Sequence, residues 1–275
     1  MPAPADALRP GVPQASLVRR VRALWRIARS VLHLLYGLLL VALFFGRSAN
    51  DGAVRMGHAR RWSVGFLRVL GVRLEVRGTA RPGAKLIVAN HVSWLDILAI
   101  DAVEPARFVS KAEVRHWPLF GRLAVAVDTL FIERDRARDA LRVVHQMAEA
   151  LQAGDTLAVF PEGTTSDGRE LLPFHANLLQ ASIATATPVQ PLALRFSDAS
   201  GAFSAAVEFV GATTMAQSVW AIACAEGLCA HVEVLPAQSV GHADRRRLAA
   251  RLRGEIAAAI EAQTGTRLDG GSSAA

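Results

Sequence analysis

The stretch Leu86–Asp96, which reads LIVANHVSWLD, decides the expected fold. Its first four residues are apolar and β-prone, and a short run of this kind is typical of a buried strand in an α/β sheet. A polar turn follows at Asn90, and apolar residues with helical spacing resume at Leu95. A strand is therefore expected to pass directly into a helix. His91 then lies at the carboxyl end of a strand, the edge where open α/β sheets place their functional groups.

His91 and Asp96 are the first candidate pair. Histidine accepts a proton near neutral pH, and a carboxylate can hold its tautomer and stabilise its protonated form. Residues five apart on a regular helix point about 140° from each other, so we expect His91 in the turn before the helix and Asp96 on the helix. Taken alone, the pair also allows a purely structural interpretation, in which the histidine is satisfied within a turn.

The alternation of β-prone and helical segments continues from residue 73 to residue 262. The expected strands are residues 73–76, 86–89, 107–109, 129–132, 157–160, 189–196, 206–210 and 232–235. The expected helices are residues 95–103, 118–126, 136–153, 174–185 and 243–262. This pattern predicts an α/β fold with a mixed, largely parallel sheet flanked by helices.

Composition divides the chain into four parts. Residues 1–16 are rich in Pro and Ala and form an expected disordered lead, residues 17–70 a helical arm, residues 71–264 the folded domain, and residues 265–275 a flexible tail. The two cysteines, Cys224 and Cys229, lack metal-ligand spacing. That count argues against a disulfide scaffold and fits a reducing compartment.

The basic charge lies in the arm. Of the 31 Lys and Arg and the 24 Asp and Glu in the chain, residues 1–61 hold ten arginines and only two acids, so the rest is nearly neutral. Helices are expected at residues 17–45 and 52–70. The apolar run of residues 31–45 is shorter than the roughly 17–20 residues that a span needs, and arginines flank both of its ends.

We therefore expect the arm to form a helical hairpin that dips into one leaflet, with its arginines on anionic head groups. A full span is left open. A cleaved signal peptide, a buried core helix and a nucleic-acid-binding arm are the alternatives, but no cleavage site and no nucleic-acid module accompany the arginines.

Three more stretches lie at expected strand boundaries, and two of them carry polar groups at the carboxyl end of a strand. Residues 131–134 (FIER) place Arg134 where a guanidinium can clamp a phosphate. Residues 160–166 (FPEGTTS) combine a carboxylate that can bond a hydroxyl or order a loop, a glycine that admits a close ligand, and three hydroxyls. Residues 188–192 (PVQPL) open a strand with prolines, which mark an edge or a bulge and would shape the wall of the site. No P-loop, nucleophile elbow or zinc pattern is present.

Together and in this order, these stretches resemble the glycerolipid acyltransferase family, which includes the lysophosphatidate acyltransferases. The matching blocks are N-H-x-x-x-x-D at residues 90–96, a K-x-E…P-x-F-G lead from Lys111 to Gly121, F-I-x-R at residues 131–134, F-P-E-G-T at residues 160–164, and a proline-bearing strand at residues 188–191. The resemblance covers roughly residues 70–200.

The resemblance implies transfer of a fatty acyl group from acyl-CoA or acyl-carrier protein to the free hydroxyl of a lyso-lipid. His91 would be the general base, Asp96 its supporting carboxylate and Arg134 the phosphate-binding residue. The other residues implied to bind substrate are Glu162, Gly163, Thr164, Thr165, Phe131, Lys111 and Pro191. No metal, no cofactor and no covalent acyl-enzyme is expected.

The first choice of acceptor is 1-acylglycerol-3-phosphate, which would give phosphatidate. Many phosphatidate-forming members carry an arginine where this chain has Thr165, and F-H-A at residue 174 replaces their usual F-K-x-G. These changes look like those of relatives that acylate other lyso-lipids, including lyso-ornithine lipid. A non-catalytic membrane-surface binding protein is the alternative from another class. We expect a membrane partner, no nucleic acid, and a place on the cytoplasmic face of the inner membrane.

Overall fold

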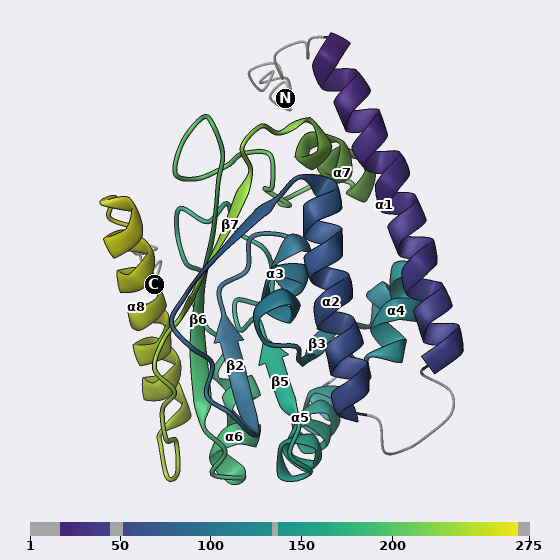
Figure 1. Ribbon diagram of the computed structural model, residues 1–275. Coiled ribbons are helices and arrows are strands. Elements are labelled where there is room, and N and C mark those ends of the chain that lie inside the picture. The colour runs from purple at the N-terminus through teal and green to yellow at the C-terminus, as the bar shows by residue number, and fades with distance from the viewer. Residues whose placement is uncertain (1–16, 45–51, 134–136, 269–275) are drawn as a thin grey trace, which may run out of the picture.

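The computed structural model of this chain describes residues 17–44, 52–133 and 137–268 (Figure 1). The helices are α1 (Leu17–Phe44), α2 (Gly52–Leu70), α3 (Leu95–Val103), α4 (Phe120–Ala126), α5 (Ala137–Gln152), α6 (Gln180–Ala184), α7 (Met215–Cys224) and α8 (Arg245–Thr264), with 3₁₀ turns η1 (Ala112–His116) and η2 (Ala176–Leu179). The strands are β1 (Arg73–Arg77), β2 (Lys85–Ala89), β3 (Arg107–Lys111), β4 (Leu130–Ile132), β5 (Thr156–Val159), β6 (Val189–Ser197) and β7 (Cys229–Val234).

The described strands form one sheet in the order β1-β7-β6-β2-β5-β3-β4. Every neighbouring pair is parallel except β6 and β7, which run antiparallel. This confirms the predicted mixed, largely parallel α/β sheet. Strand β2 occupies the centre, so helices cover both of its faces and all five of its residues are buried.

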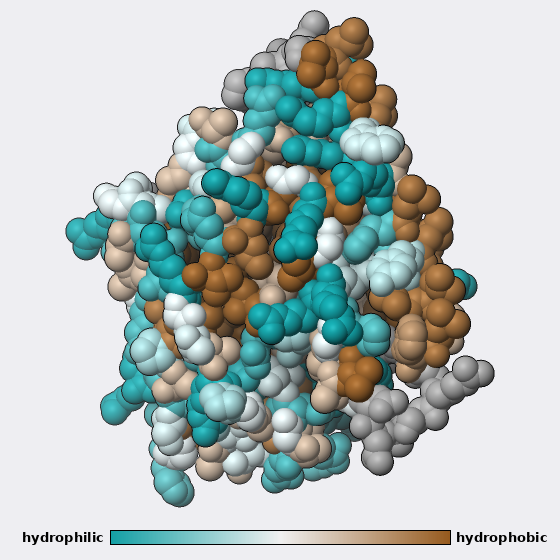
Figure 2. Space-filling model, viewed as in Figure 1, coloured by the Kyte–Doolittle hydropathy of each residue, from teal (hydrophilic) through white to brown (hydrophobic). Residues whose placement is uncertain are grey.

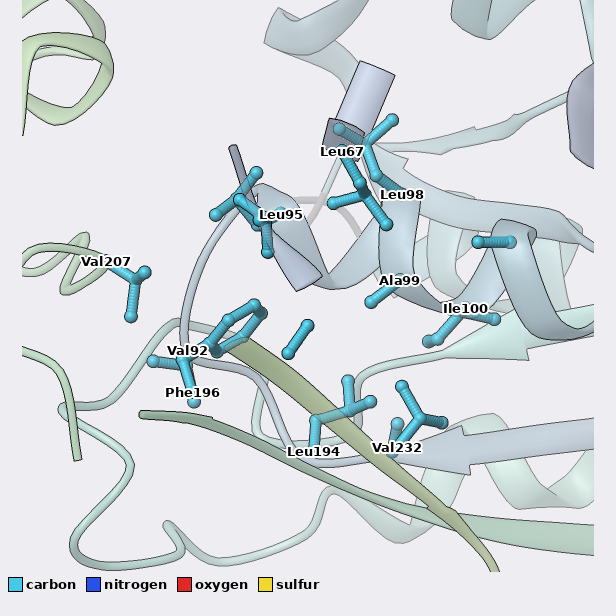
Figure 3. Close-up of a cluster of buried hydrophobic side chains, with 14 of the residues drawn as sticks. Leu67, Val92, Leu95, Leu98, Ala99, Ile100, Leu194, Phe196, Val207 and Val232 are labelled. Atoms are coloured by element: carbon cyan, nitrogen blue, oxygen red, sulfur yellow. The ribbon is translucent and has the colours of Figure 1, made fainter. Parts of the chain in front are cut away.

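Side chains of β2 alternate between two cores. Ile87 and Ala89 face α2 and α3, where they join a cluster that includes Leu67, Leu95 and Leu194 (Figure 3). Leu86 and Val88 face the opposite side, which α5, α6 and α8 cover. The continuous apolar run at residues 86–89 thus reflects a strand that is buried on both sides.

The passage from β2 to α3 follows the expectation, since His91 precedes the helix and Asp96 is its second residue. Asn90 anchors the turn to β6: its side-chain amide donates to the Leu194 carbonyl at 2.9 Å, and its side-chain oxygen accepts from the Leu194 N–H at 2.8 Å. A single side chain therefore replaces the ladder hydrogen bonds at the point where β2 leaves the sheet.

Three sequence predictions need correction. The apolar segment 206–210 is a loop rather than a strand, because Val207 is buried in the core while Glu208 and the Phe209 carbonyl bond the neighbouring loop. The helix predicted at residues 174–185 starts only at residue 176 and is broken into η2 and α6. The helix α7 was not predicted, although a capping box at Thr214 and Gln217 marks its start.

The proline-bearing strand β6 is an interior strand, so the edge interpretation of the prolines is wrong. The bulge interpretation holds. Leu192 pairs with Val234, and Val189 pairs with Gln238, so one strand advances three residues while its partner advances four. Pro191 lies within this bulge. Its carbonyl accepts the Leu235 N–H at 3.0 Å, and the Gln190 side-chain amide, in place of a Pro191 N–H, donates to the Leu235 carbonyl at 3.0 Å.

Helices α1 and α2 form the expected hairpin. His33 Nε2 lies 2.9 Å from the Trp62 carbonyl, and Trp62 Nε1 donates to the His33 carbonyl at 3.1 Å. A Cβ at Gly37 would lie 2.5 Å from Trp62 Nε1, so glycine is needed for this close crossing. Phe66, Leu67 and Leu70 of α2 belong to the same core as the sheet. The proposed domain boundary near residue 70 stays a prediction.

Part of the basic charge of α1 is used inside the molecule. Arg22 donates to Glu226 at 2.7 Å, and Arg26 donates to the carbonyls of Ala223 and Ala225 at 3.0 and 2.8 Å. These carbonyls close the C-terminal end of α7, where positive charge is favourable. Arg22 and Arg26, which we expected on anionic head groups, are therefore bound within the protein instead.

Candidate functional site

The site is built around the pair His91 and Asp96. His91 Nδ1 lies 2.7 Å from Asp96 Oδ2, and the carboxylate is fully buried whereas the imidazole is one-fifth exposed. Asp96 Oδ2 also accepts the backbone N–H groups of Val92 at 2.7 Å and Ser93 at 2.9 Å. Because Oδ2 accepts both of these N–H groups, its short contact with the imidazole is a hydrogen bond that requires a proton on Nδ1 of His91. Nε2 is then the nitrogen that can accept a proton from a bound molecule.

Aromatic packing sets the plane of the His91 ring. Phe160 stacks on it with 4.0 Å between the ring centroids and an angle of 11°, and Phe108 stacks in turn on Phe160 at 6.0 Å. Phe160 directly follows β5, which pairs in parallel with β2. The first and third sequence stretches therefore meet at the carboxyl edge of the sheet, as the strand order requires.

Glu162 binds backbone rather than solvent. Its side chain is buried, Oε1 accepts the N–H of His91 at 2.7 Å, and Oε2 accepts the N–H of Leu172 at 2.9 Å. Burial raises the pKa of Glu162 to about 7, the charge of Asp96 adds to the rise, and the two N–H groups and Arg253 oppose it. Of the two roles considered for this carboxylate, the geometry favours the ordering of a loop.

The loop after Glu162 returns to His91. Gly163 adopts a φ of +73°, which favours glycine, and Ser166 N–H donates to the His91 carbonyl at 2.8 Å. Thr164 is exposed, whereas the hydroxyl of Thr165 donates to the Phe209 carbonyl. Both the N–H and the C=O of His91 are thus held by the segment 162–166.

The second stretch lies farther along the same edge. Lys111 is exposed at the end of β3, paired in register with Ile132 at the end of β4. Phe131 is partly buried, with the guanidinium of Arg115 5.9 Å from its ring centroid. Arg134, the predicted phosphate-binding residue, lies outside the described residues. Pro191 is buried inside the sheet, in register with Val88 below the site.

An apolar cavity of about 150 Å³ lies between the helical hairpin, α3, α4 and β3. Its lining includes Phe108, which stacks on Phe160, and Trp94, three residues after His91. Two of the polar side chains in its lining, Ser63 and Asp101, are ones that the sequence pattern did not indicate. Ser63 Oγ is buried and has no hydrogen-bond partner in the described chain. The other is Asp101, whose pKa is raised to about 7 by burial.

Comparisons with known proteins show the family of this chain. The family model described as Acyltransferase matches residues 73–195. The 1-acyl-sn-glycerol-3-phosphate acyltransferase of Neisseria meningitidis serogroup B is 35% identical over 218 residues, which cover 78% of this chain and 82% of that protein. This chain belongs to the acyltransferase family.

A second relative of this acyltransferase is named after a different substrate. The lyso-ornithine lipid O-acyltransferase of Pseudomonas aeruginosa is 35% identical over 237 residues, which cover 84% of this chain and 91% of that protein. The crystal structure of the 1-acyl-sn-glycerophosphate acyltransferase from Thermotoga maritima matches with a TM-score of 0.69 at 17% identity, covering 91% of this chain and 99% of that one. This likeness shows a shared fold and confirms the predicted fold family.

Proposed function

We propose that this acyltransferase moves a fatty acyl group from acyl-CoA or acyl-carrier protein to the free hydroxyl of a lyso-lipid, with His91 as the general base. The observation that carries the proposal is the 2.7 Å contact between His91 Nδ1 and Asp96 Oδ2. It keeps the proton on Nδ1 and directs the basic Nε2 of a partly exposed ring outward. A base so placed contributes about 10²–10⁴-fold to a rate.

The proposed reaction needs one proton carrier. Nε2 of His91 takes the proton of the acceptor hydroxyl while its oxygen attacks the thioester carbonyl carbon. The tetrahedral intermediate then collapses, the C–S bond breaks, and the thiolate leaves with the proton from Nε2. Asp96 stabilises the imidazolium between the two steps, as the carboxylate does in a Ser-His-Asp triad. No metal, cofactor or covalent acyl-enzyme enters this scheme.

The apolar cavity is the proposed place for the acyl chain. Its lining is aliphatic and aromatic over most of its surface, and it lies behind the stacked rings of Phe108 and Phe160 that support His91. A methylene chain leaves water when it enters such a space, which is favourable by about 0.8 kcal/mol for each buried CH₂.

Two lyso-lipids are candidates for the acyl acceptor. We propose 1-acylglycerol-3-phosphate first, since the Neisseria relative bears that name and Arg134 is placed in sequence to hold a phosphate. Lyso-ornithine lipid is the second candidate. It is favoured by Thr165, which stands where a second arginine is usual and whose hydroxyl is already bonded to the Phe209 carbonyl, and by the name of the Pseudomonas relative.

Membrane association is proposed through α1. The buried residues of α1 are Ala23, Ser30, Leu34 and Gly37, while most of its other large apolar residues are exposed on the outer side of the helix (Figure 2). These exposed residues are Leu17, Val18, Val21, Leu24, Trp25, Val31, Leu32, Leu35, Tyr36, Leu39, Leu43 and Phe44. An apolar stripe of this length on a surface helix marks a lipid-binding surface.

The packing of α1 supports a helix that lies in one leaflet. By length and composition α1 could cross a bilayer. However, it packs on α2, α4 and α7 along the body of the protein, so a crossing would separate it from these contacts. We infer that α1 lies in the plane of the cytoplasmic leaflet. The thioester donors are on that side of the membrane, and the reducing cytoplasm keeps Cys224 and Cys229 as free thiols.

A panel of acceptors tests the proposal. Purified protein would receive one acyl-CoA with 1-acylglycerol-3-phosphate, lyso-ornithine lipid or a neutral lyso-lipid, and thiol release would be followed with product analysis. We expect turnover with at least one acidic or zwitterionic acceptor and its loss in His91→Ala, which removes the base at a partly exposed position. Full activity of His91→Ala would overturn the mechanism, and no thioester consumption in the wild type would favour a non-catalytic membrane-binding protein.

A further inference from the structure

A second cluster of reactive side chains lies on the other side of the sheet from α3. Strands β1 and β7 pair in parallel with Glu75 opposite His231, and Cys229 lies two residues before His231 on the same face of β7. The alternate residues Ala230 and Val232 point into the core beneath α2 and α3. The three polar side chains therefore gather on the face that α8 partly covers, away from His91.

The three ligand atoms are close enough for one metal ion. One oxygen of Glu75, the sulfur of Cys229 and a ring nitrogen of His231 all lie within 4.8 Å of one another. His231 Nδ1 and Glu75 Oε2 are 3.2 Å apart. Two ligands at about 2.0–2.1 Å from a tetrahedral zinc ion lie about 3.3 Å from each other, so this edge already has the required length.

The histidine is oriented as a ligand. His231 Nε2 lies 2.8 Å from Ser197 Oγ, which can accept its proton and leave Nδ1 facing Glu75 and Cys229. Metal-binding histidines are generally held in this way by their second nitrogen.

We propose that Glu75, Cys229 and His231 form a zinc site with water as the fourth ligand. The thiolate and the carboxylate neutralise Zn²⁺, so the complex adds no net charge beside Arg73, whose Nη2 lies 3.7 Å from Glu75 Oε1, or beside Arg77 and Arg195. A thiolate–imidazole–carboxylate set suits zinc and does not suit Mg²⁺ or Ca²⁺, which prefer oxygen ligands. Half of the Glu75 side chain is exposed, which leaves a path for the ion and the water.

The role of this site is structural. Strand β1 is an edge strand whose neighbour in the sheet is β7, and it follows directly after α2 of the membrane hairpin. A zinc ion bound to Glu75 on β1 and to Cys229 and His231 on β7 would join these two strands. It would therefore stabilise the junction between the hairpin and the sheet without entering acyl transfer.

Cobalt titration of tag-free, chelator-treated full-length protein tests the site. A thiolate bound to Co²⁺ gives a near-ultraviolet charge-transfer band, and tetrahedral coordination gives intense visible bands. We expect both at one equivalent, displaced by Zn²⁺, together with a zinc-dependent rise in melting temperature. The bands should be lost in Cys229→Ser and kept in Cys224→Ser, the matched control.

A second variant protects the test against misfolding, since Cys229 is buried. Glu75→Gln changes an exposed carboxylate and should weaken Co²⁺ binding at least tenfold while the far-ultraviolet circular dichroism stays the same. The proposal is overturned if wild-type protein gives no charge-transfer band, if Cys224→Ser rather than Cys229→Ser abolishes it, or if Glu75→Gln binds Co²⁺ as tightly as the wild type.

Discussion

Glu162 Oε1 accepts the backbone N–H of His91 at 2.7 Å, so the carboxylate of one sequence block holds the main chain of another. Its second oxygen accepts the N–H of Leu172, whose carbonyl in turn accepts from Arg253 of α8. The position of the imidazole therefore depends on a residue 71 positions later that need not touch the substrate. Glu162 is therefore a positioning residue for His91.

Replacement of Glu162 by glutamine should weaken both stability and turnover. Glutamine has one acceptor oxygen, so either the His91 or the Leu172 N–H loses its partner, at a cost of about 1–3 kcal/mol in the free energy of unfolding. We expect a lower melting temperature and a kcat that falls more than the KM for the acceptor rises. Glu170→Gln, at an exposed neighbouring position, is the control, and equal behaviour of the two variants would refute the holding role.

Replacement of Asp96 by asparagine should lower kcat by about 10²–10⁴-fold while the KM values change little. The amide can no longer favour a proton on His91 Nδ1 and stabilise the imidazolium, although the volume of the side chain is conserved. Steady-state kinetics with acyl-CoA would measure the effect, with Asp139→Asn on α5 as the control. A loss below threefold would show that Asp96 does not support the base.

The acyltransferase should lose stability as the pH rises toward 7, in part because of Asp101. The pKa of Asp101 is raised by burial from its ordinary value of 3.8 to about 7. Between these two pH values the carboxyl keeps its proton in the folded chain and loses it in the unfolded chain. In Asp101→Asn that contribution disappears, and the neutral side chain can still accept the Ala106 N–H.

Denaturant unfolding at pH 5 and pH 8 would measure this effect. Relative to the wild type, Asp101→Asn should gain about 2–3 kcal/mol in the free energy of unfolding on going from the lower to the higher pH. The exposed Glu149→Gln should show no such change. If the free energies of unfolding of Asp101→Asn and the wild type differ by the same amount at both pH values, the carboxyl of Asp101 is not buried in its protonated form.

The double substitution Trp25→Glu and Leu32→Glu should release the protein from liposomes. Both side chains point away from the protein, so two charges placed there oppose insertion without removing a core contact. Flotation with vesicles that contain anionic lipid would measure binding. Leu141→Glu, at an equally exposed apolar residue on α5, should float like the wild type, and continued flotation of the double variant would place the membrane contact elsewhere.

Introduction of an arginine at residue 165 should shift acceptor preference toward 1-acylglycerol-3-phosphate. Thr165→Arg gives up a hydroxyl that bonds the Phe209 carbonyl and adds a charge beside the loop that holds His91. A charge-assisted bond to phosphate is worth about 1.5–3 kcal/mol, or roughly tenfold or more in kcat/KM relative to lyso-ornithine lipid. Thr165→Val is the control for the lost hydroxyl, and an unchanged ratio would remove Thr165 from acceptor selection.

Local pattern was enough to predict much of this molecule. The buried strand at residues 86–89, the helix that begins at Leu95 and the position of His91 in the turn between them follow from hydrophobic period and helix geometry. Most other elements were predicted within a few residues. The segment 206–210 was not, because Val207 is drawn into the core by residues distant in sequence, and a short apolar run does not reveal which neighbours it will find.

The sequence by itself determined the fold class, the pairing of His91 with Asp96 and the family, because these depend on residues close together along the chain or on blocks in a set order. The tertiary structure alone decided what lies beside them. Strand β5 lies next to β2, and for this reason Glu162 and Phe160 contact His91. Arg22 and Arg26 bind residues at the end of α7. Glu75 lies close to Cys229 and His231. These contacts depend on strand order and helix packing, which hydrophobic period does not specify.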